Sequence, residues 1–144
     1  MTTASLNTTR LALFDQILGA PPDAVERAVL RNETVGEGSL DAVVDRLAAL
    51  LGVSRGEALG VLGVSRARKS RNPAMNAALL DRLYSVLDLY ARVASLIGTE
   101  PTPGWFRTPK AALGGSRPLD LLETRVGVAK LTGMVGALED GAFL

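Results

Sequence analysis

The chain has 144 residues, of which 47% are hydrophobic, and its 16 basic and 15 acidic side chains give a formal net charge of +1. This composition supports a buried core rather than a disordered chain, and the charge provides no general attraction to nucleic acid. Cysteine and histidine are absent, which excludes a disulfide framework, a thiolate metal site, a histidine base and a Ser-His-Asp triad. We therefore expect a binding protein without catalytic residues, metal or cofactor.

Charged residues interrupt every apolar run before it reaches the roughly 18 residues that cross a bilayer. The first ten residues, 1–10, lack the basic start and apolar centre of a secretory signal. We expect a cytoplasmic protein that does not associate with membranes.

Apolar residues recur at spacings of three and four along the whole chain, without strand-like alternation, and this predicts an all-α fold. A first helix is predicted over 9–18, with Leu11 on its buried face, and a second over 23–30. The stretch 31–38 is typical of a loop. Together these residues form an N-terminal extension, 1–38.

The next region contains two recognisable helix starts. Ser39 is a suitable N-cap for an amphipathic helix that ends at Gly52. Ser54 and Glu57 have the spacing of a capping box, in which each side chain satisfies a free backbone N–H, and they begin a short helix that ends near Leu62.

A glycine turn at Gly63 follows, and then a short basic helix that ends near residue 72. This arrangement is typical of a helix-turn-helix, whose second helix enters the major groove of DNA. The candidate DNA-binding residues are Arg66, Arg68, Lys69 and Arg71. An ordinary helical hairpin with a solvated basic face is the alternative. Lys69 favours that alternative, because an apolar anchor is usual six positions after the turn glycine.

The longest predicted helix spans 74–97, with Asn72 as its cap and Pro73 at its first position. Two apolar stripes run along it, and only a third face, from Asp81 to Ser95, is polar. A helix covered on two sides should be the central element. The two stripes predict self-association through this helix, although burial of both within one chain is an equal alternative.

A segment rich in proline and glycine, 98–104, is a candidate boundary. Beyond it, Pro118 should begin a short helix in which Asp120 interacts with free N–H groups or with Arg117. The last helix, predicted over 125–138, contains three glycines, each of which costs about 1 kcal/mol relative to alanine. It must therefore pack closely against another element.

The C-terminal part has a distinctive order of residues: Trp105, Leu113-Gly114-Gly115, Arg117-Pro118-Leu119-Asp120-Leu121-Leu122, Thr124, Gly127 and Gly141. This order resembles the toxin-binding domain of the MbcA/ParS/Xre antitoxin family, and the turn at 62–66 resembles the Xre-like helix-turn-helix of that family. The resemblance implies a helix-turn-helix region over 39–72 and, over 73–144, a toxin-binding domain that includes the long central helix.

The resemblance implies a complex with a RES-domain toxin, an enzyme that consumes NAD or transfers ADP-ribose from it. The antitoxin covers the toxin's active site, does no chemistry, and represses its own operon by binding operator DNA. It would form a homodimer or a larger hetero-oligomer with the toxin. A stand-alone helix-turn-helix transcriptional regulator with a C-terminal dimerisation module is the alternative.

The candidate toxin-binding residues are Trp105, Arg117, Asp120, Gly141, Phe143 and Leu144. Two large apolar side chains end the chain, where polar residues are usual. Gly141 can turn the chain out of the last helix, so that Phe143 reaches the toxin's NAD pocket. Alternatively, Phe143 folds back onto Trp105 or the last helix.

Overall fold

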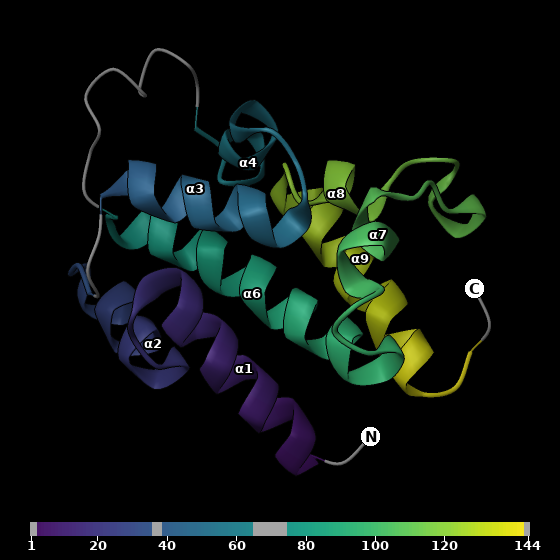
Figure 1. The fold of residues 1–144 in the computed structure, drawn as a ribbon, viewed down its shortest axis with the longest axis horizontal. Coiled ribbons are helices and arrows are strands. Elements are labelled where there is room, and N and C mark those ends of the chain that lie inside the picture. Colours follow the sequence, from purple (N-terminus) through teal and green to yellow (C-terminus); the bar gives the residue numbers. More distant parts are fainter. Residues whose placement is uncertain (1–2, 36–38, 65–74, 143–144) are drawn as a thin grey trace.

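The computed structural model describes residues 3–35, 39–64 and 75–142. These residues form helices joined by short turns, with no β-strand among them, which confirms the predicted all-α fold (Figure 1). The elements in chain order are α1 (Thr3–Leu18), α2 (Pro22–Arg31), α3 (Leu40–Leu51), α4 (Arg55–Val61), α6 (Ala77–Ile97), α7 (Thr102–Arg107), the 3-10 turn η1 (Ala111–Leu113), α8 (Pro118–Leu121) and α9 (Arg125–Glu139).

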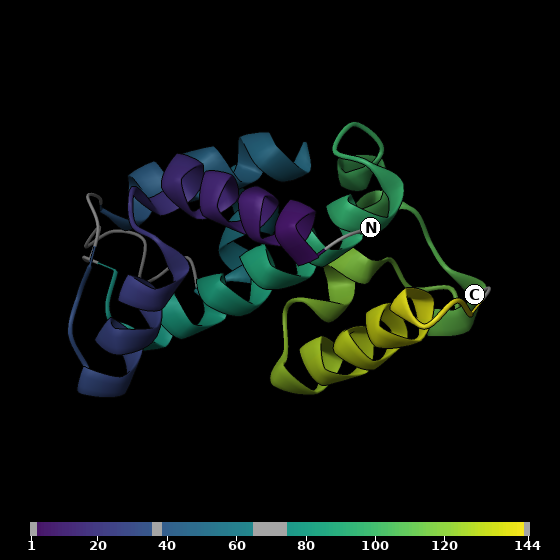
Figure 2. The same cartoon turned by 90° about the horizontal axis from the view of Figure 1, so that it is seen from below.

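Helix α6 is the central element, as its two apolar stripes predict. It packs against α1, α2, α7 and α9. Figure 2 shows α6 lying between α1 on one side and α9 on the other. Members of both stripes are buried, including Leu83 and Leu87 of one stripe and Val86 and Val93 of the other. The chain covers most of both stripes itself, as the alternative of burial within one chain predicts, while Leu96 and Ile97 at the C-terminal ends of the stripes are 37% and 42% exposed.

Side-chain caps fix the starts of four helices, α3, α4, α6 and α9. Ser39 accepts a hydrogen bond from the Ala42 N–H at 3.4 Å, and Ser54 accepts one from the Glu57 N–H at 3.1 Å, as predicted. The predicted start of α6 is wrong: the helix begins at Ala77, and its cap is Asn76, whose side chain accepts from the Leu79 N–H at 3.0 Å. Asn76 has the extended backbone angles of an N-cap, so α6 begins immediately after it.

The buried face of α1 differs from the prediction. Leu11 was expected on that face, but it is 54% exposed, while Leu13, Phe14 and Ile17 are buried. The helix begins at Thr3, and its buried face is the one that packs on α6. There, the ring of Phe14 meets the ring of Tyr84 edge-on at 5.4 Å.

Two expectations near the end of α6 also need correction. The break predicted over 98–104 is shorter, because α7 already begins at Thr102, whose hydroxyl donates to the Gly98 carbonyl at 2.6 Å. Ser95, expected on the polar face of α6, is buried. The part of the chain after Gly98 packs back against α6 through α7 and α9.

Candidate functional site

Helix α7 inserts an aromatic pair beside the end of α6. Phe106 is fully buried, and its ring stacks on that of Tyr90 at a centroid distance of 5.6 Å. Trp105 is half-buried, meets Phe106 edge-on at 5.1 Å, and has the Lys110 ammonium 5.0 Å from its ring centroid. Burial lowers the pKa of Lys110. Trp105, predicted to bind a partner, thus already makes contacts within the chain, and its remaining exposed surface is at the rim of this cluster.

Arg117 and Asp120 form a reciprocal cap at the start of α8. The Arg117 N–H donates to Asp120 Oδ2 at 3.1 Å, and the Arg117 guanidinium donates to Asp120 Oδ1 at 2.7 Å. The hydrogen bond from Arg117 is the main reason why the pKa of Asp120 is lowered, and the bond to Asp120 likewise raises the pKa of Arg117. Asp120 therefore contacts both Arg117 and a free N–H group, the two interactions that the sequence predicted as alternatives.

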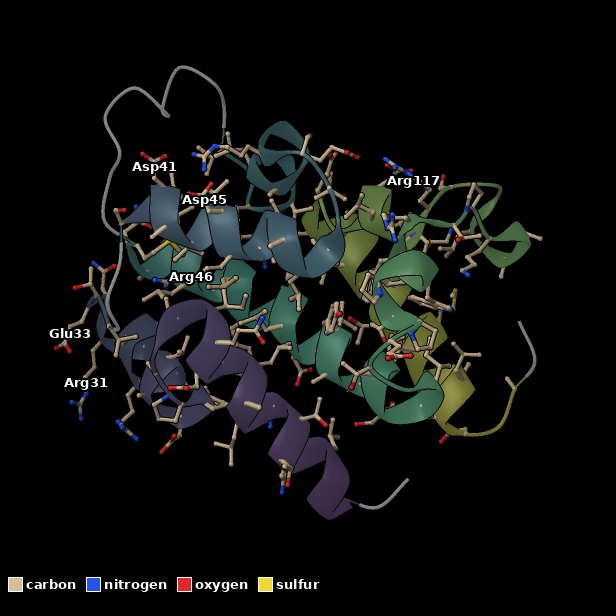
Figure 3. The ribbon with its side chains drawn as sticks, in the orientation of Figure 1. Arg31, Glu33, Asp41, Asp45, Arg46 and Arg117 are labelled. Carbon is tan, nitrogen blue, oxygen red and sulfur yellow. The ribbon has the colours of Figure 1, made fainter. Side chains whose placement is uncertain are left out.

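Arg117 also connects α8 to α4. The guanidinium of Arg117, which Figure 3 labels, lies 3.3 Å from Oε2 of Glu57 in the first turn of α4. Glu57 was predicted to complete a capping box with Ser54, but its carboxylate pairs with Arg117 instead, and only the Ser54 half of that box forms. This arrangement makes Arg117 and Asp120 part of the internal framework of the candidate site.

A second connection between α4 and α8 comes from Arg82 of α6, a residue that the sequence did not single out. Its guanidinium donates to the Val61 carbonyl at 2.9 Å and to the Leu122 carbonyl at 2.8 Å. These carbonyls end α4 and α8 respectively. The one sequence feature that could have identified Arg82 is its position within a helix that is apolar on two sides.

Helix α9 packs on the rest of the chain through a narrow face. Leu131 and Val135 are its buried residues. At Gly127, a Cβ atom would lie 2.1 Å from the Leu121 carbonyl oxygen, so a side chain there would clash with the backbone. The Arg92 Nε donates to Glu139 Oε2 at 3.1 Å and attaches the end of α9 to α6. The predicted close packing of this glycine-containing helix is confirmed at Gly127.

The opposite face of α9 is open. Val126 is 81% exposed, and Ala129, Lys130 and Gly133 are exposed as well. A Cβ atom built on Gly133 would have no neighbour within 4 Å in the described structure. Val126 was not identified from the sequence. Its helical phase differs from that of the buried pair Leu131 and Val135, and this difference could have predicted that Val126 faces outward.

The chain turns sharply after α9. Gly141 has a φ of +95°, in the region that favours glycine, and it is exposed. The Ala142 N–H donates to the Ala137 carbonyl at 3.0 Å, which closes the helix end. Gly141 thus has the backbone geometry expected of it, whereas Phe143 and Leu144 lie outside the described residues.

The structure describes the glycine turn that precedes the basic segment. Gly63 has a φ of +70°, and the Val64 N–H donates to the Leu59 carbonyl at 3.0 Å. Val64 is buried, so the turn is fixed against the core. The four candidate DNA-binding residues follow directly, but Arg66, Arg68, Lys69 and Arg71 lie outside the described residues.

Among the described residues, no group of three or more His, Cys, Asp or Glu side chains could hold a metal ion. None of the helices in this described part is both long enough and apolar enough to cross a bilayer. The site is thus a protein surface built from α7, α8 and α9 on the end of α6.

Residues 95–141 match the family model of the antitoxin Xre/MbcA/ParS C-terminal toxin-binding domain. The match begins near the end of α6, later in the chain than the resemblance does, and it ends at the turn after α9. No curated protein matches the chain. The segment that contains α7, α8 and α9 is therefore similar to the antitoxin Xre/MbcA/ParS C-terminal toxin-binding domain, and this match confirms the resemblance indicated by the order of residues from Trp105 to Gly141.

Proposed function

We propose that this protein is an antitoxin that neutralises a RES-domain toxin, an enzyme that consumes NAD or transfers ADP-ribose from it. The observation that supports this proposal is the match of residues 95–141 to a toxin-binding domain. The antitoxin would cover the active site of the toxin and take no part in its chemistry.

We place the toxin contact on the open face of α9 and on the tail that follows Gly141. That face presents the exposed side chains of Val126 and Lys130 and the exposed backbone surface at Gly133. Small and apolar residues allow a partner to approach closely and to bury apolar surface. Arg117 and Asp120 would hold this surface in place, because they already bind each other.

The test is co-expression with a RES-domain toxin encoded in the neighbouring reading frame, followed by growth and pull-down assays. Val126→Asp should weaken toxin binding, because it places a charge in the proposed contact. Leu30→Asp is the matched control, since Leu30 is 85% exposed on α2, outside the toxin-binding domain. Deletion of residues 142–144 should weaken binding about thirtyfold, the equivalent of about 2 kcal/mol for one buried phenylalanine side chain.

Two results would contradict this assignment. Equal neutralisation by the wild type and by Val126→Asp at low expression would exclude the open face of α9. Full neutralisation by the chain that lacks residues 142–144 would exclude the tail and leave the open face of α9 and the surface around Trp105. Failure of the wild type to bind the toxin at all would reject the proposed function itself.

We further propose that the protein represses its own operon through a DNA-binding helix-turn-helix. The support is the fixed glycine turn at Gly63, followed in sequence by four cations within six residues. Simultaneous alanine substitution of Arg66, Arg68, Lys69 and Arg71 should abolish binding to the promoter fragment. Promoter binding that survives this substitution would reject the proposal.

A further inference from the structure

We propose that Arg82 of α6 is a positioning residue that couples the two binding activities, so that toxin bound to α9 tightens DNA binding by the helix-turn-helix. This inference rests on the proposed function, because it needs a toxin on α9 and DNA at the basic segment. It adds a physical connection between the two sites that neither binding activity requires by itself.

A single nitrogen atom of Arg82 binds both regions. Its Nη2 donates to the Val61 carbonyl at 2.9 Å and to the Leu122 carbonyl at 2.8 Å. Hydrogen bonds from a charged donor are stronger than neutral ones, and two bonds from one atom fix their acceptors relative to each other. The end of α4 therefore cannot move relative to the end of α8 without the loss of one of these bonds.

The same guanidinium lies against the glycine turn that precedes the basic segment. A Cβ atom built on Gly63 would be 3.7 Å from Arg82 Cζ, an ordinary van der Waals distance. Gly63 follows Val61 by two residues, and the next residue, Val64, is buried. The position of Arg82 thus helps to set the position of the turn that leads in sequence to the four candidate DNA-binding residues.

Helix α9 is connected to the Leu122 carbonyl through its first turn. A Cβ atom on Gly127 would lie 2.1 Å from the Leu121 carbonyl oxygen, so α9 is in close contact with this backbone. Leu122 is the next residue and is fully buried. A displacement of the first turn of α9 therefore shifts the backbone at 121–122 and the acceptor that Arg82 binds. Chains of packed groups and hydrogen bonds of this kind can carry coupling between distant sites.

Two further contacts attach α4 to the region of α8, which lies beside it (Figure 1). Glu57 in the first turn of α4 pairs with Arg117 at 3.3 Å. A Cβ atom on Gly60 would lie 2.7 Å from Glu123 Oε1, so the Glu123 carboxylate is close to the α4 backbone. The first helix of the helix-turn-helix is thus attached to the toxin-binding domain at its first turn, at Gly60 and at its end.

These contacts determine the direction of the effect. Toxin on α9 would hold α9 and the end of α8 in the arrangement in which Arg82 binds both carbonyls. A turn that is already held in its binding geometry loses less conformational freedom when DNA binds. Coupling between two sites typically changes affinity by about 5- to 150-fold and is reciprocal.

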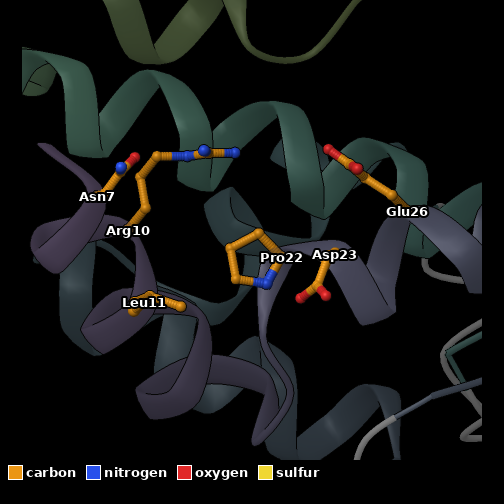
Figure 4. A pocket seen from close by; sticks show the side chains of 6 residues that line it. All are labelled: Asn7, Arg10, Leu11, Pro22, Asp23 and Glu26. Carbon is orange, nitrogen blue, oxygen red and sulfur yellow. The ribbon is translucent and has the colours of Figure 1, made fainter. Parts of the chain in front are cut away.

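An arginine of α1 provides a matched control. Arg10 lines the hollow between α1 and α2 (Figure 4), lies 3.1 Å from Asp88 and donates to the Tyr84 hydroxyl at 2.8 Å. Both of these partners belong to α6, so Arg10 joins α1 to α6. Its replacement removes one cation, as the replacement of Arg82 does, but leaves the contacts between α4 and α8 in place.

Fluorescence anisotropy of the purified full chain with the promoter fragment, with and without saturating toxin from the neighbouring reading frame, tests the coupling. Toxin should lower the wild-type Kd for DNA about tenfold, and promoter DNA should lower the Kd for toxin by the same factor. Arg82→Met should lose most of this effect, because methionine has no donor for either carbonyl. Arg10→Met should keep the effect.

Arg82→Lys decides the question if Arg82→Met loses helical content. It keeps the charge, but its ammonium ends one bond short of the position of Nη2, so it should lose the effect as well. An equal toxin effect in the wild type and in Arg82→Lys would overturn the inference, because the toxin would then act by another route, such as direct contact with DNA.

The same titrations separate this inference from the proposed function. A wild type that binds both partners without any change in the Kd for DNA would overturn the coupling and leave the antitoxin function standing. A wild type that binds no toxin would reject the proposed function, and the coupling with it.

Discussion

Single glycines within α9 have different roles, although the sequence alone does not distinguish them. Gly127 lies in the first turn of α9 and Gly133 near its middle, and the sequence predicted only that a helix with such glycines must pack closely. Gly127 meets the Leu121 backbone, whereas Gly133 faces open space. The distinction depends on the path of the chain through α8, which the periodicity of α9 does not contain.

These two glycines give the first prediction at the residue scale. Gly127→Ala should lower the free energy of unfolding by about 1–3 kcal/mol, because the new Cβ overlaps a backbone carbonyl that cannot move aside. Gly133→Ala should instead raise it by about 0.4–1 kcal/mol, because alanine favours the helix and meets no neighbour. Urea unfolding measures both, and equal stability of the two variants would contradict the close approach at Gly127.

Helix boundaries were predictable where one cap had no competitor nearby. Ser39 and Ser54 were identified because each precedes an amphipathic helix. The start of α6 was misplaced because two asparagines, Asn72 and Asn76, lie one turn apart. The structure selects Asn76, since Met75 is buried in the core and precedes the helix. Long-range partners decide such cases, as they do for Glu57, which binds Arg117 from a distant part of the sequence.

The cap of α8 gives a prediction at the element scale. The pKa of Asp120 is lowered in the folded chain, mainly by the hydrogen bond from Arg117, so the unfolded chain binds the proton more tightly. The contribution of this pair to stability is therefore complete above the ordinary carboxyl pKa and is lost as the pH falls through the lowered value. Because the Asp120 side chain is 44% exposed, we expect it to be no more than about 1 kcal/mol.

Asp120→Asn should remove this contribution at neutral pH and flatten the acid dependence of the unfolding free energy. Urea titrations at neutral and acid pH measure the difference. Asp140→Asn, at an exposed aspartate after α9, is the control. A variant that keeps the acid dependence of the wild type would show that another carboxylate is responsible.

At the scale of the whole molecule, the sequence predicted which helix is central better than it predicted which side chains are exposed. The two-sided α6 was correctly placed at the centre, but its apolar stripes left self-association and burial within one chain as equal alternatives, and the packing of α1, α2, α7 and α9 on α6 favours burial. Exposed side chains such as Leu30 and Val126 do not stand out in a helical pattern, because the pattern does not show which face another helix covers.

The salt dependence of DNA binding gives the number of phosphate contacts made by the basic segment. The net charge of the chain is only +1, so binding must come from local cations, namely Arg66, Arg68, Lys69 and Arg71. Four phosphate contacts from each copy of a dimer give eight in total, and a slope of about −7 in log affinity against log salt. This slope corresponds to a loss of roughly 10⁴ in affinity between about 50 and 200 mM salt, whereas a single copy should have a slope of about −4 and lose roughly a hundredfold.

Fluorescence anisotropy with the promoter fragment, repeated over a salt series, measures this slope. The wild type should show the steep dependence, and simultaneous alanine substitution of Arg66, Arg68, Lys69 and Arg71 should remove it, because that variant lacks the cations that neutralise phosphates. Val126→Asp should behave as the wild type. A shallow slope for a wild type that sediments as a dimer would mean that only one basic segment reaches the DNA, since each neutralised phosphate contributes nearly one unit to the slope.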